Sequence, residues 1–482
     1  MLEVRFRRAP PDAALLAAVP VRVATPLPAF AEAAGFRAEP GQVLDLPDAP
    51  RRVLIGLGTP ARRLDWERAG GTAAAAVAEA PHLMLHARGL APEEAAAMAA
   101  GACLRAWRFD ALRTGKRDPY LRKLTVLVDA PAAARAAWAE QSPAIRGCLF
   151  ARGLVAEPAN HLTTREFVER LRSLAEHGIA VEVLGRKRLA REGFGGLLAV
   201  GGASASPPRL VVLRWRGRVT APPVAFVGKG VVFDTGGVSI KPAGGMEAMR
   251  ADMAGAAACA GAMLALALRD SPAPAVAVLA IAENAVGAGA YRPGDVLRMH
   301  AGTTVEVVDT DAEGRLILAD ALHHAASRFK PRAMIDLATL TGAIISALGH
   351  HRAGLFGTDA ALLAALASAG ESVGEDLWPM PIGASHRADL ASDIADLRQC
   401  VPSARGEGGW AARFIPDACH GAAFLREFGG NVPWAHLDIA GVDTADEAHA
   451  LGPAGPTGFG VRLLDALARG WFEEEELHPR PA

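Results

Sequence analysis

Short apolar runs alternate with alanine-rich stretches over the first part of the chain. The runs at residues 53–58, 82–86 and 124–128 are separated by helix-forming sequence such as residues 91–102. Strands that alternate with helices are typical of an α/β domain. We therefore predict a smaller N-terminal α/β domain over residues 1–140.

A second series of apolar runs follows a break near Pro131–Pro143. Because these runs are almost continuously apolar, they predict strands of a sheet that is covered on both faces: 181–184, 210–213, 224–227, 276–282, 305–308 and 333–338. We predict a larger catalytic α/β domain over residues 141–482, with a mixed, mainly parallel central sheet covered by helices. In such sheets, ligands bind at the carboxyl ends of the strands.

Charge and cysteine usage narrow the class of protein. The net charge of −1 gives no basic excess for nucleic acid. The longest apolar run, residues 253–268, is shorter than the ~20 residues that cross a bilayer, so we expect a buried helix and no membrane partner. Residues 1–21 resemble a signal peptide only loosely, because acidic residues and prolines interrupt the apolar run. Five scattered cysteines without CxxC spacing favour free thiols and a cytoplasmic location.

Charged side chains are concentrated in two places that follow predicted strands. The segment V-V-D-T-D-A-E-G-R-L, residues 307–316, lies between an apolar run and a predicted helix at 317–326, and its charged members are Asp309, Asp311, Glu313 and Arg315. The segments V-G-K-G-V-V-F-D-T-G-G-V-S-I-K-P and M-R-A-D-M-A-G-A-A contribute Lys229, Asp234, Lys241 and Asp252.

Carboxylates that converge in one cleft repel one another and raise one another's pKa. Divalent cations relieve this repulsion, and carboxylate oxygens suit Mg, Mn or Zn. Two metal ions bridged by carboxylates form a common hydrolytic device. The glycines in these segments would let the backbone pass close to such a site.

Each charged residue also has an ordinary structural interpretation. Asp311 and Glu313 could be charges at a helix N-terminus, and Asp252 could be an N-cap. Lys229 could lie in an ordinary Gly-Lys-Gly turn, and Lys241 could be a solvated loop residue. The gathering of all these residues at strand ends of one domain favours the metal site.

The two clusters closely resemble motifs of the leucine aminopeptidase (cytosol aminopeptidase) family, peptidase M17. The resemblance extends to A-R-G-L-V-A-E-P-A-N-H-L-T from Ala151, D-L-A-T-L-T-G-A from Asp336 and W-A-H-L-D-I-A-G from Trp434. It covers residues 151–465.

This resemblance implies a two-metal leucyl aminopeptidase that releases Leu- or Met-like N-terminal residues by attack of a hydroxide that bridges the metals. The ions would be Zn or Mn, or alternatively Mg or Co, and the implied ligands are Lys229, Asp234, Asp252, Asp311 and Glu313. As a ligand, Lys229 must be neutral, so its pKa would have to be lowered. Lys241 would be catalytic and stabilise the oxyanion. Arg315 would also be catalytic, holding a bicarbonate ion as general base with the help of backbone at Gly314 and Leu340.

The same resemblance implies a pocket for the first substrate side chain, lined by Met249, Thr339, Gly342 and Ala440. Core packing is the alternative for Met249 and Ala440. The resemblance also implies peptide substrates and a homohexamer. Three departures from the family pattern are visible. Asp309 stands where the family usually has Asn, and Gly201–Ser204 stand where it usually has a Gly-Gln-Gly-Ser-like turn. Residues 402–421 stand where it usually has a short Gly-Gly-Ser run.

Two other functions were weighed against the aminopeptidase. Some members of the family also bind DNA or act as chaperones, but the full set of catalytic-type residues argues against a role without catalysis. Another two-metal hydrolase, such as a phosphoesterase, would generally use histidine ligands, and neither cluster contains one. His350, His351, His386 and His420 are interpreted as surface or packing residues.

Overall fold

The protein is described by a computed structural model that covers residues 1–11, 16–23, 25–46, 51–115, 120–402 and 415–473. By its internal contacts the chain divides into two compact units. The first comprises Met1–Leu149 and Ala445–Gly455, and the second comprises Phe150–Thr444 and Pro456–Ala482.

The division between the units falls inside helix α4 (Pro131–Ala156), which is 26 residues long and contains Pro143. The residues of the predicted break, Pro131–Pro143, form the first half of this continuous helix. Pro131 stands at the first helical position, where a missing N–H breaks no hydrogen bond. Pro143 lies within the helix and removes one backbone donor, but the turns on both sides continue.

The first unit contains a six-stranded sheet in the order β1-β6-β5-β2-β4-β3. All its pairs are parallel except β3 with β4. Its strands are β1 (Glu3–Arg7), β2 (Leu16–Arg22), β3 (Val43–Leu46), β4 (Arg52–Gly58), β5 (His82–His86) and β6 (Lys123–Leu127), and its helices include α1 (Ala29–Ala33), α2 (Arg63–Ala76) and α3 (Pro92–Arg105).

The second unit is built around an eight-stranded sheet in the order β15-β14-β17-β13-β9-β10-β8-β7. Its four central strands, β17, β13, β9 and β10, run parallel, whereas β14, β8 and β7 pair antiparallel with their inner neighbours. The strands are β7 (Ala180–Leu184), β8 (Arg209–Trp215), β9 (Val224–Asp234), β10 (Ala275–Asn284), β13 (Ala333–Ala338), β14 (Ala353–Gly357), β15 (Leu377–Pro379) and β17 (Trp434–Asp438). The predicted mixed, mainly parallel sheet is confirmed.

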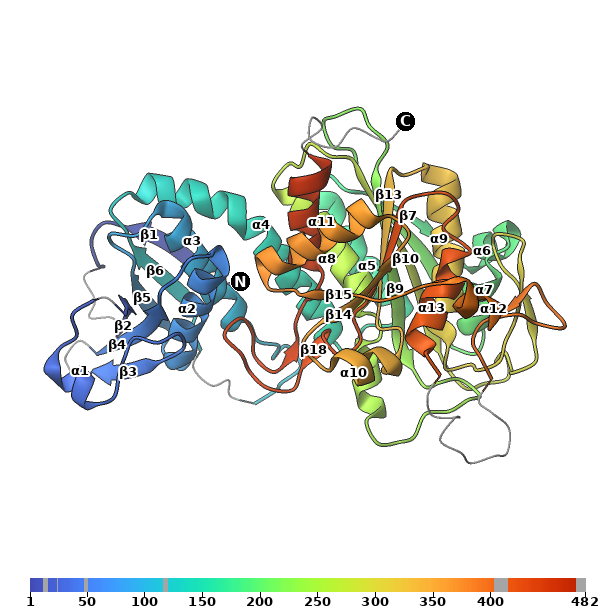
Figure 1. Cartoon of the computed structure of the whole chain (residues 1–482), viewed down its shortest axis with the longest axis horizontal. Helices are drawn as coiled ribbons and strands as arrows, with labels where there is room; N and C mark the ends of the chain where they lie inside the picture. The colour runs from blue at the N-terminus through green and yellow to red at the C-terminus, as the bar shows by residue number, and fades with distance from the viewer. Residues whose placement is uncertain (12–15, 24, 47–50, 116–119, 403–414, 474–482) are drawn as a thin grey trace. The chain divides into compact units, whose positions relative to one another are not determined.

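Helices cover both faces of this sheet, as Figure 1 shows. Helices α8, α11 and α14 pack together on one face, while α7, α9 and α13 lie on the other. The helices of this unit are α5 (Thr164–Arg172), α6 (Arg186–Glu192), α7 (Gly195–Val200), α8 (Ala254–Leu268), α9 (Glu313–Phe329), α10 (Gly342–Leu348), α11 (Ala360–Val373), α12 (Ala384–Ala388), α13 (Asp417–Arg426) and α14 (Val461–Leu467), with short η1 (Ser173–His177), η2 (Met246–Ala251) and η4 (Ala468–Phe472).

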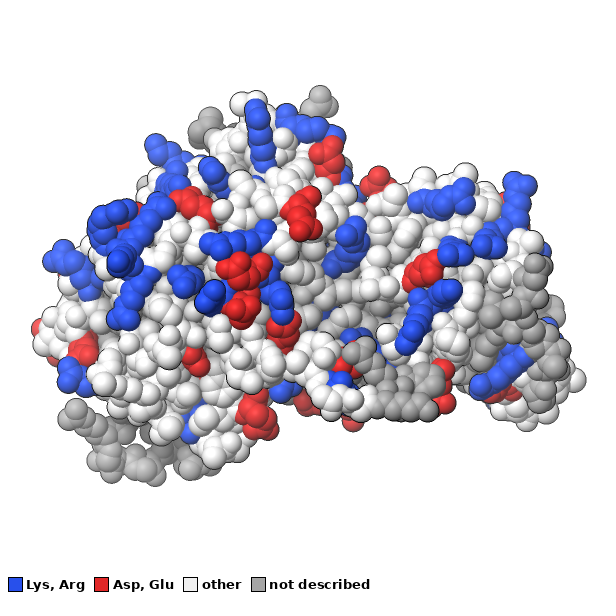
Figure 2. All heavy atoms as spheres, turned by 180° about the vertical axis from the view of Figure 1, so that it is seen from behind, with Lys and Arg blue, Asp and Glu red and all other residues white. Residues whose placement is uncertain are grey.

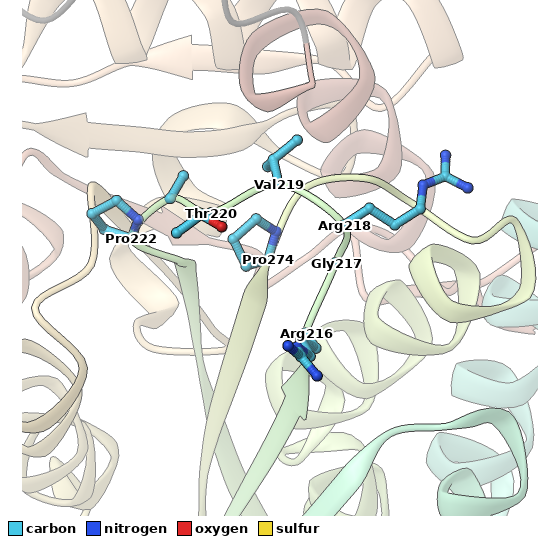
Figure 3. A pocket seen from close by; sticks show the side chains of 8 residues that line it. Arg216, Gly217, Arg218, Val219, Thr220, Pro222 and Pro274 are labelled. Atoms are coloured by element: carbon cyan, nitrogen blue, oxygen red, sulfur yellow. The ribbon is translucent and has the colours of Figure 1, made fainter.

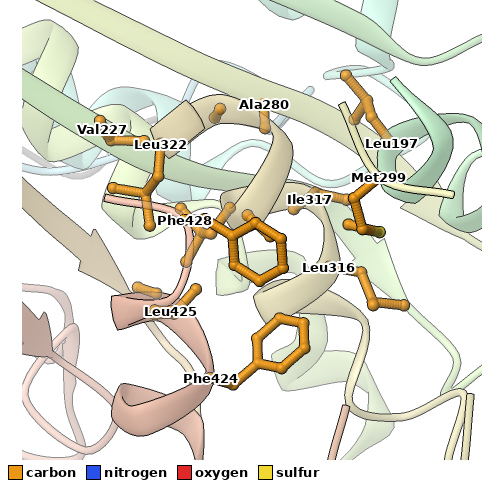
Figure 4. Close-up of a cluster of buried hydrophobic side chains, with 14 of the residues drawn as sticks. Leu197, Val227, Ala280, Met299, Leu316, Ile317, Leu322, Phe424, Leu425 and Phe428 are labelled. Carbon is orange, nitrogen blue, oxygen red and sulfur yellow. The ribbon is translucent and has the colours of Figure 1, made fainter. Parts of the chain in front are cut away.

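The core on the α9 side joins helices from distant parts of the chain. Figure 4 shows Phe424 of α13 and Phe428, which follows the end of that helix, beside α9 and close to the sheet. Both rings are at most 1% exposed, and their centroids lie 5.1 Å apart. This packing fixes the N-terminal turn of α9, which carries Glu313, against the ends of the central strands.

The predicted buried strand at 305–308 is only partly correct. Residues Thr304–Glu306 form β12, which pairs with β11 (Val296–Arg298) and β16 (Leu397–Arg398) in a separate three-stranded sheet. Val305 and Val307 are fully buried, so the apolar pattern predicted their burial correctly. The pattern does not indicate which sheet the strand joins. A further pair, β18 (Thr444–Ala445) and β19 (Gly455–Pro456), forms a two-stranded sheet.

Among the described residues, one segment, Met246–Leu268, is long and apolar enough by length and composition to cross a membrane. Most of it is buried inside the protein, so it is the core helix that the sequence predicted. All five cysteines are buried. On the face shown in Figure 2, basic and acidic side chains are interspersed with uncharged surface.

Candidate metal centre

Strand β9 positions the first group of charged residues. Ten of its eleven residues are buried, with Lys229 near its middle and Asp234 at its carboxyl end. Lys229 therefore lies within a central strand and not in a turn, which excludes one ordinary interpretation. The chain then passes through η2 to Asp252, next to the start of α8, while Glu313 opens α9.

The Lys229 ammonium group is the hub of the buried cluster. Its Nζ lies 2.7 Å from Asp252 Oδ1, 2.8 Å from Glu313 Oε1 and 2.8 Å from the carbonyl oxygen of Thr339. The Lys229 side chain is 3% exposed and that of Glu313 is 1% exposed. Burial alone would lower the pKa of Lys229, but the charges of Asp252 and Glu313 outweigh it and raise that pKa above its usual value.

Asp252 is not an N-cap, since Met253 precedes α8 without a side-chain cap and the carboxylate points to Lys229 instead. The Thr339 hydroxyl donates to Asp252 Oδ1 at 2.6 Å. The other oxygen, Oδ2, is buried and has no hydrogen-bond partner among the described residues. Burial raises the pKa of Asp252 well above its usual range. An unpartnered buried carboxylate oxygen is costly unless a cation or donor meets it.

Lys241 forms ion pairs with Asp234 and Asp311 at the more exposed side of the cluster. Its Nζ lies 2.9 Å from Asp234 Oδ2 and also pairs with Asp311. The Lys241 side chain is 20% exposed and that of Asp311 is 34% exposed. Burial raises the pKa of Asp311 to about 7 despite the hydrogen bond from Lys241.

Three carboxylates form a group that fits a metal ion. Asp234, Asp252 and Glu313 are all buried, and one oxygen of each lies within 4.8 Å of the others. An oxygen-rich donor set of this kind suits hard or borderline divalent cations. The unpartnered Asp252 Oδ2 adds a further free donor atom. The residues present therefore fit a divalent metal.

Comparison with known proteins identifies the family. The profile of the cytosol aminopeptidase family, catalytic domain, matches residues 149–465. The chain belongs to this family. Membership makes it an aminopeptidase, which is a hydrolase of peptides. The prediction of the family from the sequence motifs is confirmed.

Curated relatives match over most of both chains. A probable cytosol aminopeptidase of Brucella melitensis is 45% identical over 433 residues, 87% of this chain and 87% of that protein. One of Gluconobacter oxydans is 43% identical over 446 residues, 90% of this chain and 89% of that protein.

Two solved structures share the fold across nearly the whole chain. The bottromycin maturation enzyme BotP in complex with Mn is 38% identical with a TM-score of 0.86, covering 96% of this chain and 100% of that chain. A mutant of tomato leucine aminopeptidase is 28% identical with a TM-score of 0.84, covering 97% of this chain and 96% of that chain.

Several residues that hold the charged cluster in place were missed by sequence reasoning. The Asn284 amide donates to Asp234 Oδ1 at 2.7 Å and to the Thr310 carbonyl at 3.0 Å. The Tyr291 hydroxyl donates to the same carbonyl at 2.8 Å. Asn284 ends β10, beside Asp234 at the end of β9, so a search for polar residues at every predicted strand end could have found it.

Asp309, where the family has Asn, shapes the loop that leads into the site. Its Oδ1 accepts a hydrogen bond from the Asp311 N–H at 2.9 Å, and Gln399 Oε1 accepts one from the Val308 N–H at 2.6 Å. Asp309 therefore acts as a turn residue two positions before Asp311. Another departure, residues 402–421, lies largely outside the described residues, since 403–414 are not among them.

The residues predicted to bind bicarbonate have protein partners. Arg315 donates from Nη1 to the Gln399 carbonyl at 3.0 Å and from Nη2 to Asp417 Oδ1 at 2.8 Å. The Leu340 N–H donates to Asp438 Oδ1 at 3.0 Å. Gly314 packs tightly against Lys229, because a Cβ at Gly314 would lie 2.6 Å from Lys229 Cε.

The four residues predicted for the substrate pocket differ in environment. Met249 is half-buried on η2, and Ala440 is buried after β17. Gly342 opens α10 and is exposed, and a Cβ there would meet nothing within 4 Å. Thr339 lies closest to the charged cluster, since both its hydroxyl and its carbonyl contact cluster residues.

A separate cavity of about 460 Å³ lies away from these residues. Figure 3 shows its lining around the loop between β8 and β9, including Arg216, Thr220 and Pro274. This loop leads into Val224, the first residue of β9, whereas Asp234 is the last residue of that strand. The length of the strand therefore places the cavity about 30 Å from the acids. It is not part of the aminopeptidase site.

Proposed function

We propose that this chain is a two-metal aminopeptidase that releases apolar, Leu- or Met-like N-terminal residues from peptides. The observation that carries the proposal is the buried carboxylate cluster of Asp234, Asp252 and Glu313, with an unpartnered oxygen on Asp252. A buried cluster of like charges is unfavourable without compensating cations.

Five residues would hold the metal ions: Lys229, Asp234, Asp252, Asp311 and Glu313. Bound ions would supply Lewis-acid polarisation of the scissile carbonyl and a water of lowered pKa as nucleophile. Mn and Zn are the first candidates, with Mg and Co as alternatives, and the Mn complex of BotP supports Mn. The neighbouring carboxylates raise the pKa of Lys229 when no metal ion is bound. Lys229 can therefore bind a metal as a neutral amine only if the arriving cations displace its proton.

Lys241 would stabilise the transition state. Burial alone would lower its pKa, but Asp234 and Asp311 raise it, so the ammonium group stays charged at neutral pH. It is also partly exposed, unlike Lys229, and can reach a bound peptide. A fixed positive charge beside a developing oxyanion is stronger in a buried site than in water.

The other predicted properties stay proposals. The open space at Gly342 and the half-buried Met249 support an apolar pocket for the first side chain. The name of the curated relatives supports a cytoplasmic location. A homohexamer remains an expectation from the family resemblance.

Hydrolysis of leucine p-nitroanilide by the metal-stripped protein, before and after addition of Mn or Zn, tests the proposal. We expect activity to vanish with chelation and return with metal. Bis(p-nitrophenyl) phosphate serves as the control substrate for the phosphoesterase alternative. Activity that survives complete metal removal, or turnover of the phosphate diester alone, would refute the proposal.

A further inference from the structure

Arg315 is a buried cation, and among the described residues its ion-pair partner is a single carboxylate. The residue is 1% exposed and lies on α9 two positions after Glu313. A guanidinium group does not lose its proton in proteins, so when buried it needs an anion close by. That anion is Asp417, whose Oδ1 lies 2.8 Å from Arg315 Nη2.

The other acceptors around Arg315 are also provided by the chain. Gln399 contributes its carbonyl oxygen to Nη1 at 3.0 Å. Helix α13 passes close above the guanidinium, because a Cβ at Gly421 would lie 3.5 Å from Arg315 Nη2 and 3.0 Å from Leu340 Cδ2. The Leu340 N–H, one of the two backbone groups predicted to help bind bicarbonate, donates to Asp438 Oδ1.

One nitrogen of the guanidinium lacks a partner among the described residues. Arg315 Nε is buried and has no hydrogen-bond partner among the described residues. Asp417 has a second carboxylate oxygen, and a bidentate pairing of Arg with a carboxylate would satisfy Nε as well. A second anion beside Asp417 would instead be repelled by its charge. The carboxylate of Asp417 therefore competes with the predicted bicarbonate for this guanidinium.

The sequence accounts for the difference. Asp417 lies in P-D-A-C-H-G, within the segment for which the family resemblance implies a short Gly-Gly-Ser run. Glycine offers no side chain to a neighbouring arginine, so such a chain must take its anion from solution. We propose that Asp417 is the anion held by Arg315 and that this chain needs no bicarbonate for turnover.

The inference rests on the proposed function for its link to catalysis, and Asp417 acts there as a positioning residue through Arg315. With Asp417 present, the charge of Arg315 is neutralised and its guanidinium is held in one orientation beside the metal ligands. Without it, the arginine becomes a site for a small anion from solution.

Binding of ¹³C-labelled bicarbonate, followed by NMR, tests the proposal on the metal-loaded full chain. Wild type, Asp417→Ala and Asp417→Asn are compared in CO₂-free buffer at constant ionic strength. The matched control is Asp389→Asn, which removes another carboxylate next to α13, one that contacts His420 Nε2 at 3.0 Å and not Arg315. We expect binding to Asp417→Ala and none to wild type or the control.

Turnover of leucine p-nitroanilide supplies a second readout. In CO₂-free buffer, Asp417→Ala should lose about 10- to 100-fold in kcat with little change in KM, while its metal content stays intact. Added bicarbonate should restore part of that loss and leave the wild-type rate unchanged. The isosteric Asp417→Asn variant guards against a folding defect in the alanine variant.

The outcomes separate the two claims. Bicarbonate binding to wild type as strong as to Asp417→Ala would overturn the assignment of Asp417, as would binding to neither. A wild-type rate that falls on removal of CO₂ would overturn it too. If wild type does not hydrolyse the substrate under any metal, the proposed function fails, while the binding measurement still decides what Arg315 holds.

Discussion

Substitution of Gly314 by alanine should disable the metal centre while leaving the fold intact. Gly314 is the second residue of α9, next to Glu313, one of the proposed metal ligands. A Cβ there would lie 2.6 Å from Lys229 Cε and 2.8 Å from its Nζ. Reaching ordinary contact requires a shift of about 0.8 Å, either of the lysine or of the first turn of α9. Either movement separates Lys229 from Glu313.

The stability terms of this substitution nearly cancel. Alanine is favoured over glycine inside a helix by about 1 kcal/mol. Insertion of a methyl group into a packed site costs about 1–3 kcal/mol. Thermal stability is therefore a poor readout, and activity is a good one, because a misplacement of about 1 Å at a catalytic site can cost about 100-fold in rate.

The assay compares Gly314→Ala with Gly153→Ala. Gly153 lies in α4, and a Cβ there meets nothing within 4 Å, so the control gains helix propensity without a clash. Metal content is measured by mass spectrometry after equilibrium dialysis, and kcat with leucine p-nitroanilide. Normal metal content and turnover in Gly314→Ala would show that the contact with Lys229 does not matter and would refute the reasoning.

Three further predictions follow from the described contacts. Asp311→Asn and Glu313→Gln should abolish hydrolysis and keep the fold, with Glu427→Gln, a surface ion-pair partner, as control; near-normal turnover would contradict the ligand assignment. Thr339→Val removes the hydroxyl that donates to Asp252 and should weaken metal binding about 10- to 100-fold, seen by dialysis against graded Mn; unchanged affinity would rule out this orienting role. Burial, together with the charge of His300, lowers the pKa of His324 to about 4, whereas its value in the unfolded chain is about 6.5. The unfolded chain therefore binds a proton first, and the folded state loses stability as the pH falls from 6.5 towards 4. His324→Gln should flatten this part of the curve of melting temperature against pH, and an unchanged curve would assign the acid sensitivity to other groups.

Local pattern was enough to predict many elements. The strand predicted at residues 333–338 has the same first and last residues as β13, Ala333–Ala338. The alanine-rich run at 253–268 forms the buried helix α8. Nearly every residue of both elements is buried and therefore apolar, so each element is visible as an apolar run in the sequence. The acids at strand ends were found for the same reason, since charge beside a buried strand is unusual.

Long-range pairing was not predictable in the same way. The strand at 304–306 pairs with residues 397–398, and nothing in its own residues specifies that partner. Pro143 suggested a boundary because proline removes a backbone hydrogen bond from a helix, and this effect can be predicted from one residue. The flanking turns of α4 stabilise the helix in spite of it, and their contribution cannot be predicted from that residue alone. The contacts of Thr339 with Asp252 and of Arg315 with Asp417 span 87 and 102 residues. Such contacts become visible only when the sheet has placed the strand ends together.

The proposed ligands all lie between Lys229 and Glu313, whereas the partners of Arg315 come from Gln399 and Asp417. The chain thus encodes its metal-binding core and the surroundings of its arginine in separate stretches of sequence. Recombination between relatives can exchange the later stretch and leave the earlier one untouched. A chimaera that receives a Gly-Gly-Ser run in place of Asp417 and the residues just before it should keep its metal affinity and acquire a dependence on dissolved carbonate. Within one family, the demand for an external ion can therefore change independently of the hydrolytic core.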